Sequence, residues 1–171
     1  EGNVTVPNQI LHAGDTDTYM QFHAVNEWRV VAGGYERFAI GAAVVVNEDG
    51  HDADFRVESD TNTHMLFVDG GNNRVGIGTS SIDSNAKLQI EDSTNPNINI
   101  DRTSSLLTGN HVGYINFQNN GAVYGYMGAW VESASGTDGK LAFGTRNGTS
   151  VVDRLTIAST GAATFSSSVL G

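Results

Sequence analysis

The apolar residues of this chain come in short packets in which they alternate with other residues, and no other feature constrains the fold as strongly. The packets are RVGIGT from Arg74, KLQI from Lys87, NINI from Asn97, YINF from Tyr114, KLAF from Lys140 and RLTI from Arg154. Alternation with a period of two places one set of side chains on one face of a β-strand, whereas an amphipathic helix needs a period of about 3.6. The packets therefore predict short β-strands.

Turn sequences separate these packets. Glycine, asparagine, threonine and serine, which suit turns and strands better than helix interiors, make up 66 of the 171 residues. The clearest turn signals are Glu48-Asp49-Gly50, Asp69-Gly70-Gly71-Asn72-Asn73, Asn119-Asn120-Gly121, Thr137-Asp138-Gly139 and Asn147-Gly148. Many short strands at close spacing predict an all-β architecture.

Charge and cysteine content exclude several classes of protein. The formal net charge is -10, the wrong sign for a surface that gains affinity by neutralising phosphates, so we expect no nucleic acid partner. No apolar run reaches the roughly 18 residues that cross a bilayer, and no signal peptide is visible, so we expect no membrane insertion. The chain has no cysteine for disulfides, zinc ligation or nucleophilic catalysis. Because it begins at Glu1, we expect a processed product or a fragment.

Two segments match at the same offset and predict an internal duplication. Residues 15–22 and 60–67 share the pattern D-T-x-T-x-M-x-F, and Arg29 and Val30 match the Arg-Val pair that lies 45 residues later. The alternative is chance similarity between β segments of low sequence diversity. A polar, turn-rich stretch after Thr79 places a boundary near residue 84. We therefore expect an N-terminal β module over residues 1–84 and a C-terminal β module over residues 85–171.

No motif in the sequence predicts catalysis. Gly76-Ile77-Gly78 follows a strand, but neither the third glycine nor the helix of a dinucleotide fingerprint follows it. With 19 acidic residues, a pair of carboxylates at glycosidase spacing arises by chance, and sequence spacing in a β protein does not reveal it. We therefore predict that the chain is not an enzyme and has neither a catalytic residue nor a cofactor.

Acidic and histidine residues are the candidate metal ligands of this chain. The acids that offer oxygen ligands for calcium are Asp15 and Asp17, and Glu48, Asp49, Asp52 and Asp54. Their spacing is not that of an EF-hand, so we interpret them as solvated turn acids. The five histidines lack the spacing of a zinc-binding helix, although a single histidine on a trimer axis stays open as an ion ligand. No metal site is predicted.

A repeat unit of about 45 residues, the offset between the matched segments, buries too little apolar surface to stand alone. Without a helix or a disulfide, its apolar face must meet another repeat or another chain. Gly76 and Gly78 alternate with Val75 and Ile77, which leaves one strand face bare for close backbone approach. In VYGYMGAW, residues 123–130, aromatic residues alternate with small and apolar residues, so neither strand face is polar and both need cover from other parts of the protein. An intertwined homo-oligomer satisfies these demands.

Three stretches resemble modules of bacteriophage tail fibre and tailspike proteins. The first, residues 45–81, contains FRVESD, LFVD and RVGIGT in series. The second is GYINFQNNGAVYGYMGAW, residues 113–130, and the third is LAFGTRNGTSVVDRLTIASTGAATFSSSVLG, residues 141–171. The third is similar to the segment that often precedes a self-cleaving chaperone domain in such fibres, and we expect that domain to be cleaved off or lacking here. The chain departs from the family at Ile82, where a proline is common.

The resemblance implies a virion fibre protein that assembles as a homotrimer with a β-prism or β-helix-like shaft. We therefore predict a structural protein at the surface of the particle that contributes to host attachment, with other virion proteins and a host glycan or protein as further partners. The alternatives are a capsid decoration protein and a carbohydrate-active tailspike enzyme. Threefold repetition of a weak site would raise avidity.

Aromatic residues are the candidate receptor contacts, because they are apolar and form hydrogen bonds at an edge. The candidates are Trp28, Tyr35 and Trp130. We expect Tyr35, flanked by glycines and charged residues, to be exposed on a loop. Tyr124 and Tyr126 lie within an apolar strand, so we expect them to fill the core between chains.

Overall fold

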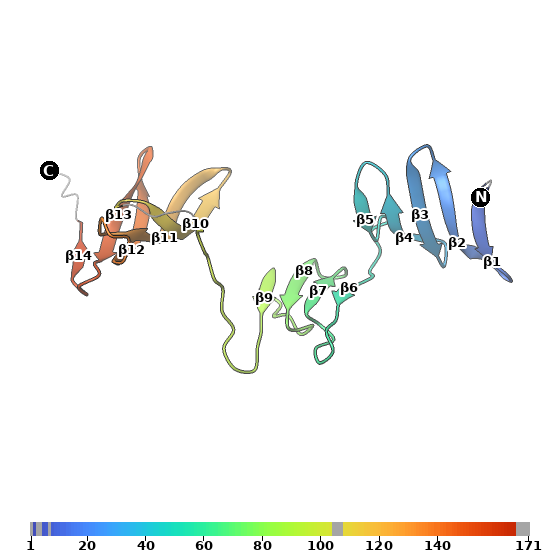
Figure 1. Ribbon diagram of the computed structural model, residues 1–171, viewed down its shortest axis with the longest axis horizontal. Coiled ribbons are helices and arrows are strands. Elements are labelled where there is room, and N and C mark those ends of the chain that lie inside the picture. Colours follow the sequence, from blue (N-terminus) through green and yellow to red (C-terminus); the bar gives the residue numbers. More distant parts are fainter. Residues whose placement is uncertain (1, 3–4, 7, 104–107, 167–171) are drawn as a thin grey trace. The chain divides into compact units, whose positions relative to one another are not determined.

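The computed structural model describes Gly2 and residues 5–6, 8–103 and 108–166. These residues form fourteen β-strands in three open sheets, and they contain no α-helix. Each sheet is built from strands that follow one another in the chain (Figure 1). The predicted all-β class is confirmed. The described residues contain no helix long and apolar enough to cross a membrane.

The first sheet, blue to teal in Figure 1, is an antiparallel meander of five strands. Its strands are β1 (Gln9–His12), β2 (Asp15–Ala24), β3 (Glu27–Ala32), β4 (Tyr35–Ile40) and β5 (Val44–Val46). Left-handed residues form its tight turns, with φ of 64° at Asn26 between β2 and β3 and 62° at Gly33 before β4. Short polar turns thus keep sequential strands as neighbours.

The second sheet, green in Figure 1, has four strands and mixed pairing. Its strands are β6 (Phe55–Val57), β7 (Leu66–Asp69), β8 (Arg74–Ile77) and β9 (Leu88–Ile90). β8 and β9 are parallel, so the segment between them must cross back over the sheet. Thr79 of this crossover is buried, and Ile82 lies against Gly76. The crossover therefore covers one face of the sheet.

The third sheet, orange to red in Figure 1, is again a five-stranded antiparallel meander. Its strands are β10 (His111–Asn119), β11 (Ala122–Val131), β12 (Gly139–Asn147), β13 (Ser150–Ile157) and β14 (Ala163–Phe165). Asn120 and Gly121, with φ of 49° and 78°, form the two-residue turn between β10 and β11. This left-handed pair is typical of a type I′ hairpin, which the Asn-Gly sequence favours.

The chain divides into two compact units, Glu1–Asn97 and Ile98–Gly171. The sequence placed this division near residue 84. The difference arises because β9 follows residue 84 and yet pairs with β8, with Leu88 opposite Val75. The first unit therefore continues past the polar, turn-rich stretch.

The segments matched by the 45-residue offset differ in conformation. Residues 15–22 lie within β2, whereas most of the matching segment precedes β7. Gln21 pairs with Arg29 across β2 and β3, but Arg74, the counterpart of Arg29, pairs with Asp69. The shared sequence pattern therefore does not correspond to a shared strand register.

Each sheet is a single layer and encloses few side chains. Among the described residues, the buried apolar side chains are Val31, Phe67, Val131 and Ala142. Folded domains of ordinary size bury most of their large apolar side chains. Within one chain, the backbone ladders and local contacts therefore hold the strands, with little contribution from a core.

Two aromatic rings of β11 lie over glycines in the third sheet. The Trp130 ring covers Gly128, where an added Cβ would come within 2.9 Å of the ring. The Tyr126 ring covers Gly144 of β12, where an added Cβ would overlap it. Ala142, which pairs with Gly128, is completely buried among these groups. The glycines thus provide the space that the rings occupy.

This packing predicts the effect of adding one methyl group. We expect Gly144→Ala to destabilise the protein by about 1–3 kcal/mol, because the new Cβ would displace the Tyr126 ring. Gly139→Ala is the matched control on the same strand, since its Cβ would lie 3.6 Å from the Trp130 carbonyl oxygen, an ordinary contact. Urea unfolding followed by circular dichroism measures both variants. Equal stability of the two would contradict the packing described.

The carboxylate of Asp69 closes the turn between β7 and β8. It accepts hydrogen bonds from the Asn72 backbone N–H at 2.8 Å and from the Asn72 side-chain amide at 3.0 and 3.1 Å. These bonds favour the ionised form, so they lower the pKa of Asp69, and Arg74 adds a smaller effect. The stabilisation is complete above the ordinary value of 3.8 and is lost as pH falls through the lowered folded pKa.

An NMR titration of the carboxyl groups tests this turn. We expect the pKa of Asp69 to lie below 3.8, and Asn72→Ala to raise it only part of the way back, since the backbone donor remains. Titration of Asp69 at or above its ordinary value in the unmodified protein would show that the turn does not hold the carboxylate in this way.

Candidate interaction surfaces

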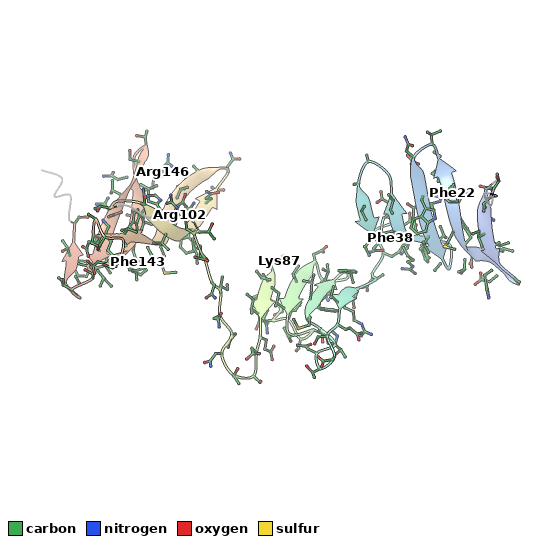
Figure 2. The ribbon with its side chains drawn as sticks, viewed as in Figure 1. Phe22, Phe38, Lys87, Arg102, Phe143 and Arg146 are labelled. Carbon is green, nitrogen blue, oxygen red and sulfur yellow. The ribbon has the colours of Figure 1, made fainter. Side chains whose placement is uncertain are left out.

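One face of the third sheet carries an unbroken apolar row. Its members, directly opposite one another on β10 to β14, are Ile115, Met127, Phe143, Leu155 and Phe165. The next row on this face consists of Gly113, Ala129, Leu141, Ile157 and Ala163. Neither row contains a polar side chain. We call this the C-terminal apolar face; Figure 2 labels Phe143 at its centre.

The chain covers this face only in part. Ile100 lies against Gly113, and Ile98 and Ile100 line a shallow hollow of about 270 Å³ together with Met127 and Leu141. Both isoleucines remain exposed themselves, at 67% and 49%. Phe165 on the edge strand is 77% exposed. Most of the C-terminal apolar face therefore meets water in a single chain.

The first sheet has the same arrangement on one of its faces. The row across β1 to β5 consists of Ile10, Met20, Val30, Phe38 and Val46. Trp28, Ile40 and Val44 form the neighbouring row. The Trp28 and Phe38 rings meet edge to face, with centroids 5.8 Å apart. We call this the N-terminal apolar face; Phe22 and Phe38 are labelled in Figure 2.

The second sheet repeats the pattern on the face that its crossover leaves open. The row across β6 to β9 consists of Phe55, Val68, Val75 and Leu88. Beside it lie Val57 opposite Leu66, and Ile77 opposite Ile90. Phe55, Val57, Ile77 and Leu88 are all exposed. All three sheets thus present an apolar row that reaches from the first strand to the last.

The opposite face of the first sheet is polar. Arg29 donates to Gln21 Oε1 at 2.7 and 2.9 Å and to Glu36 Oε2 at 2.8 Å. These groups border a hollow of about 320 Å³ whose floor includes Ala39 and Val45. The Arg29 and Glu36 side chains are largely shielded from solvent, at 23% and 16% exposed. This face therefore lacks the uniform apolar character of its reverse side.

The three candidate receptor contacts lie on different surfaces. Trp28 belongs to the N-terminal apolar face. Tyr35 begins β4 and is 42% exposed, with its ring 3.7 Å from the His51 ring centroid and beneath the Arg37 guanidinium. Trp130 lies on the third sheet, opposite the C-terminal apolar face. The structure does not gather these residues into one site, and their receptor role stays a prediction.

Two residues adjoining Trp130 were not singled out by the sequence. His111 and Tyr114 of β10 contact one another with ring centroids 5.4 Å apart, and His111 lies 5.0 Å from Trp130. Tyr126, which we expected in the core between chains, lies on the same face, 5.4 Å from Trp130. The register of β10 against β11 brings these rings together, and a sequence pattern alone does not fix that register.

The acidic residues considered as ligands lie in turns and at strand ends. Asp15 Oδ1 accepts the Asp17 backbone N–H at 3.2 Å. Hydrogen bonding between the two side chains lowers the pKa of Asp15 and raises the pKa of Asp17. Asp49 accepts the Glu36 N–H, and Asp54 accepts the Gly70 N–H. Within the described ranges, no three His, Asp or Glu side chains are grouped to hold a metal ion.

Comparisons with protein-family models, with curated proteins and with solved structures give no match to this chain.

Proposed function

We propose that this chain is a segment of a homotrimeric virion fibre that has no enzymatic role and contributes to host attachment at the particle surface. The observation that carries the proposal is the open apolar row on each of the three sheets. The sequence resemblance to tail fibre and tailspike modules supports the viral setting. The exposed apolar rows by themselves favour self-association, independently of the sequence resemblance.

An apolar row of this kind favours association with copies of itself. Fully burying a side chain such as Leu or Phe contributes about 1.5–3 kcal/mol, so a row of five outweighs the ordering of the few side chains involved. Soluble monomers rarely expose contiguous apolar patches of this extent. Identical faces from identical chains match in length and in composition along the whole row. A second copy is therefore the simplest cover for each face.

Sheet width is compatible with three copies around an axis. Five strands spaced about 4.8 Å apart make a sheet about 24 Å wide, and three such sheets closed into a triangle place each one about 7 Å from the axis. A two-sheet sandwich places each sheet about 5 Å from its midplane. Phe38 and Phe143 lie on or beside the central strands, and Met20 and Met127 are flexible enough to fill the larger interior. This geometry supports a three-sided prism of apolar faces.

Adjacent residues on β10 provide a test of the association. Ile115 and Asn116 are both exposed and point to opposite faces of the sheet. We expect light scattering of the full chain to give the mass of three copies, and Ile115→Lys to lower that mass, because the ammonium group would have to enter an apolar interior. Asn116→Lys adds the same charge to the reverse face and leaves the mass unchanged. A compact monomer, or equal behaviour of the two variants, would rule out association through this face.

The position on the particle is tested by antibody labelling of virions that carry this protein. We expect label on a tail or fibre appendage in electron microscopy, and antibody fragments against the chain to reduce adsorption to host cells. Label spread over the capsid lattice would instead identify a decoration protein, and cleavage of host polysaccharide by the purified chain would identify an enzyme. Either result would replace the proposed function.

A further inference from the structure

We propose that the aromatic face of the third sheet binds an uncharged, linear oligosaccharide. The inference rests on the proposed attachment role and names the chemical class of the receptor. The site is an aromatic strip made of His111, Tyr114, Tyr124, Tyr126 and Trp130. Tyr124, Tyr126 and Trp130 come from β11. His111 and Tyr114 come from the neighbouring strand β10.

Four of the five rings of the strip are linked by direct contacts. His111 links Tyr114 to Trp130, with centroids 5.4 and 5.0 Å away, and Tyr126 continues the contact 5.4 Å from Trp130. Tyr124 is the unpaired residue where the register of β11 against β10 shifts. Its ring lies beneath Arg146, two positions along β12 from the Gly144 that Tyr126 covers, so it borders the same side of the sheet, and it is 53% exposed. From Tyr124 to Trp130 the strip is about 20 Å long, at about 3.4 Å per residue. This length accommodates several sugar rings in a row.

Neighbouring groups hold the rings in place. Gly128 and Gly144 lie beneath Trp130 and Tyr126, and the Tyr126 hydroxyl donates to Asp153. Arg146 lies over the Tyr124 ring at 5.4 Å, fixed by its bonds to the Val123 and Gly148 carbonyl oxygens. A surface ordered in advance loses little side-chain entropy when a ligand binds. Figure 2 labels Arg146.

Charged groups distinguish this face from the self-associating one. Arg146, Lys140 and Asp153 lie among or beside the rings, whereas the two apolar rows on the reverse side contain no ionisable side chain. Burying these three groups in a chain-to-chain interface would carry a desolvation cost that the C-terminal apolar face avoids. The aromatic strip therefore stays in water when the chains associate.

The mixture of groups on the strip selects sugars among possible ligands. A pyranose ring offers a flat patch of C–H groups that packs on an aromatic face, and its hydroxyl groups both donate and accept hydrogen bonds. Asp153 and Asn116 accept such bonds, and Arg146 and Lys140 donate them. The unit that carries the strip, residues 98–171, has four acidic and four basic residues and therefore no formal net charge. Nothing in this charge balance favours a polyanionic or polycationic glycan, so an uncharged chain is the ligand that fits.

The test uses the full chain and three probes: maltohexaose, cellohexaose and chitohexaose. Calorimetry measures their affinities, and the fluorescence of a Trp28→Phe variant reports on Trp130 as the remaining one of the two tryptophans. We expect at least one probe to bind and to shift the Trp130 emission. Tyr124→Ala should then weaken binding about tenfold through loss of stacking, whereas Tyr124→Phe retains the ring and most of the affinity.

His12→Ala, an exposed ring on another sheet, serves as the control and should leave the affinity unchanged. Melting curves of each variant confirm that the sheet is intact. The proposal is overturned if none of the three probes binds, or if Tyr124→Ala and Tyr124→Phe bind equally well. If the probes fail while the chain still labels a virion appendage and its antibodies still reduce adsorption, the attachment role stands and only the glycan assignment falls.

Discussion

The structure depends on the need to remove three apolar sheet faces from water. In each sheet the cross-strand register aligns one apolar side chain from every strand, from Ile115 to Phe165 in the third sheet and from Ile10 to Val46 in the first. A globular domain would cover such a row with a helix or a second sheet of its own. Here the described residues supply only short segments, such as Ile98–Ile100, as partial cover. The missing layer is what the proposed assembly provides.

In the proposed fibre, one side of the third sheet would serve assembly and the other side would serve recognition. Alternation along β11 sends Met127 to the apolar side and Tyr126 to the aromatic side, so one strand serves both. If chains associate as proposed, the charged groups among the rings would favour keeping that side in solvent, and their absence from the two apolar rows would permit burial of the other. Three copies would then present three aromatic strips, and weak single contacts would combine into firm attachment.

Much of this architecture was predictable from the sequence, and the limits have physical causes. Alternating packets and Asn-Gly turns indicate the sheets, since period and turn chemistry are local properties. The prediction of a strand from NINI, residues 97–100, is wrong: this segment forms no strand, and Ile98 and Ile100 lie against the third sheet instead. The boundary near residue 84 was displaced because the parallel pairing of β9 with β8 depends on a contact across a crossover. The sequence indicates Trp130 as a candidate contact but not its neighbours in the aromatic strip. His111 and Trp130 come together only through the register of β10 against β11, which neither segment determines alone. The apolar neighbours of Tyr126 predict a place in the core between chains, and a single chain does not test that prediction.

The glycines beneath the rings carry a consequence for how the chain reaches its partners. Tyr126 has room over Gly144, but a slip of one residue would set it against Phe143 or Thr145, both of which are larger. Such a slip would also exchange the two sides of the strand. The Tyr126–Gly144 contact therefore favours the observed register of β11 against β12. In the proposed assembly, each chain would then present a complete apolar face before it meets another copy, because this register places Met127 and Phe143 on the same side of the sheet.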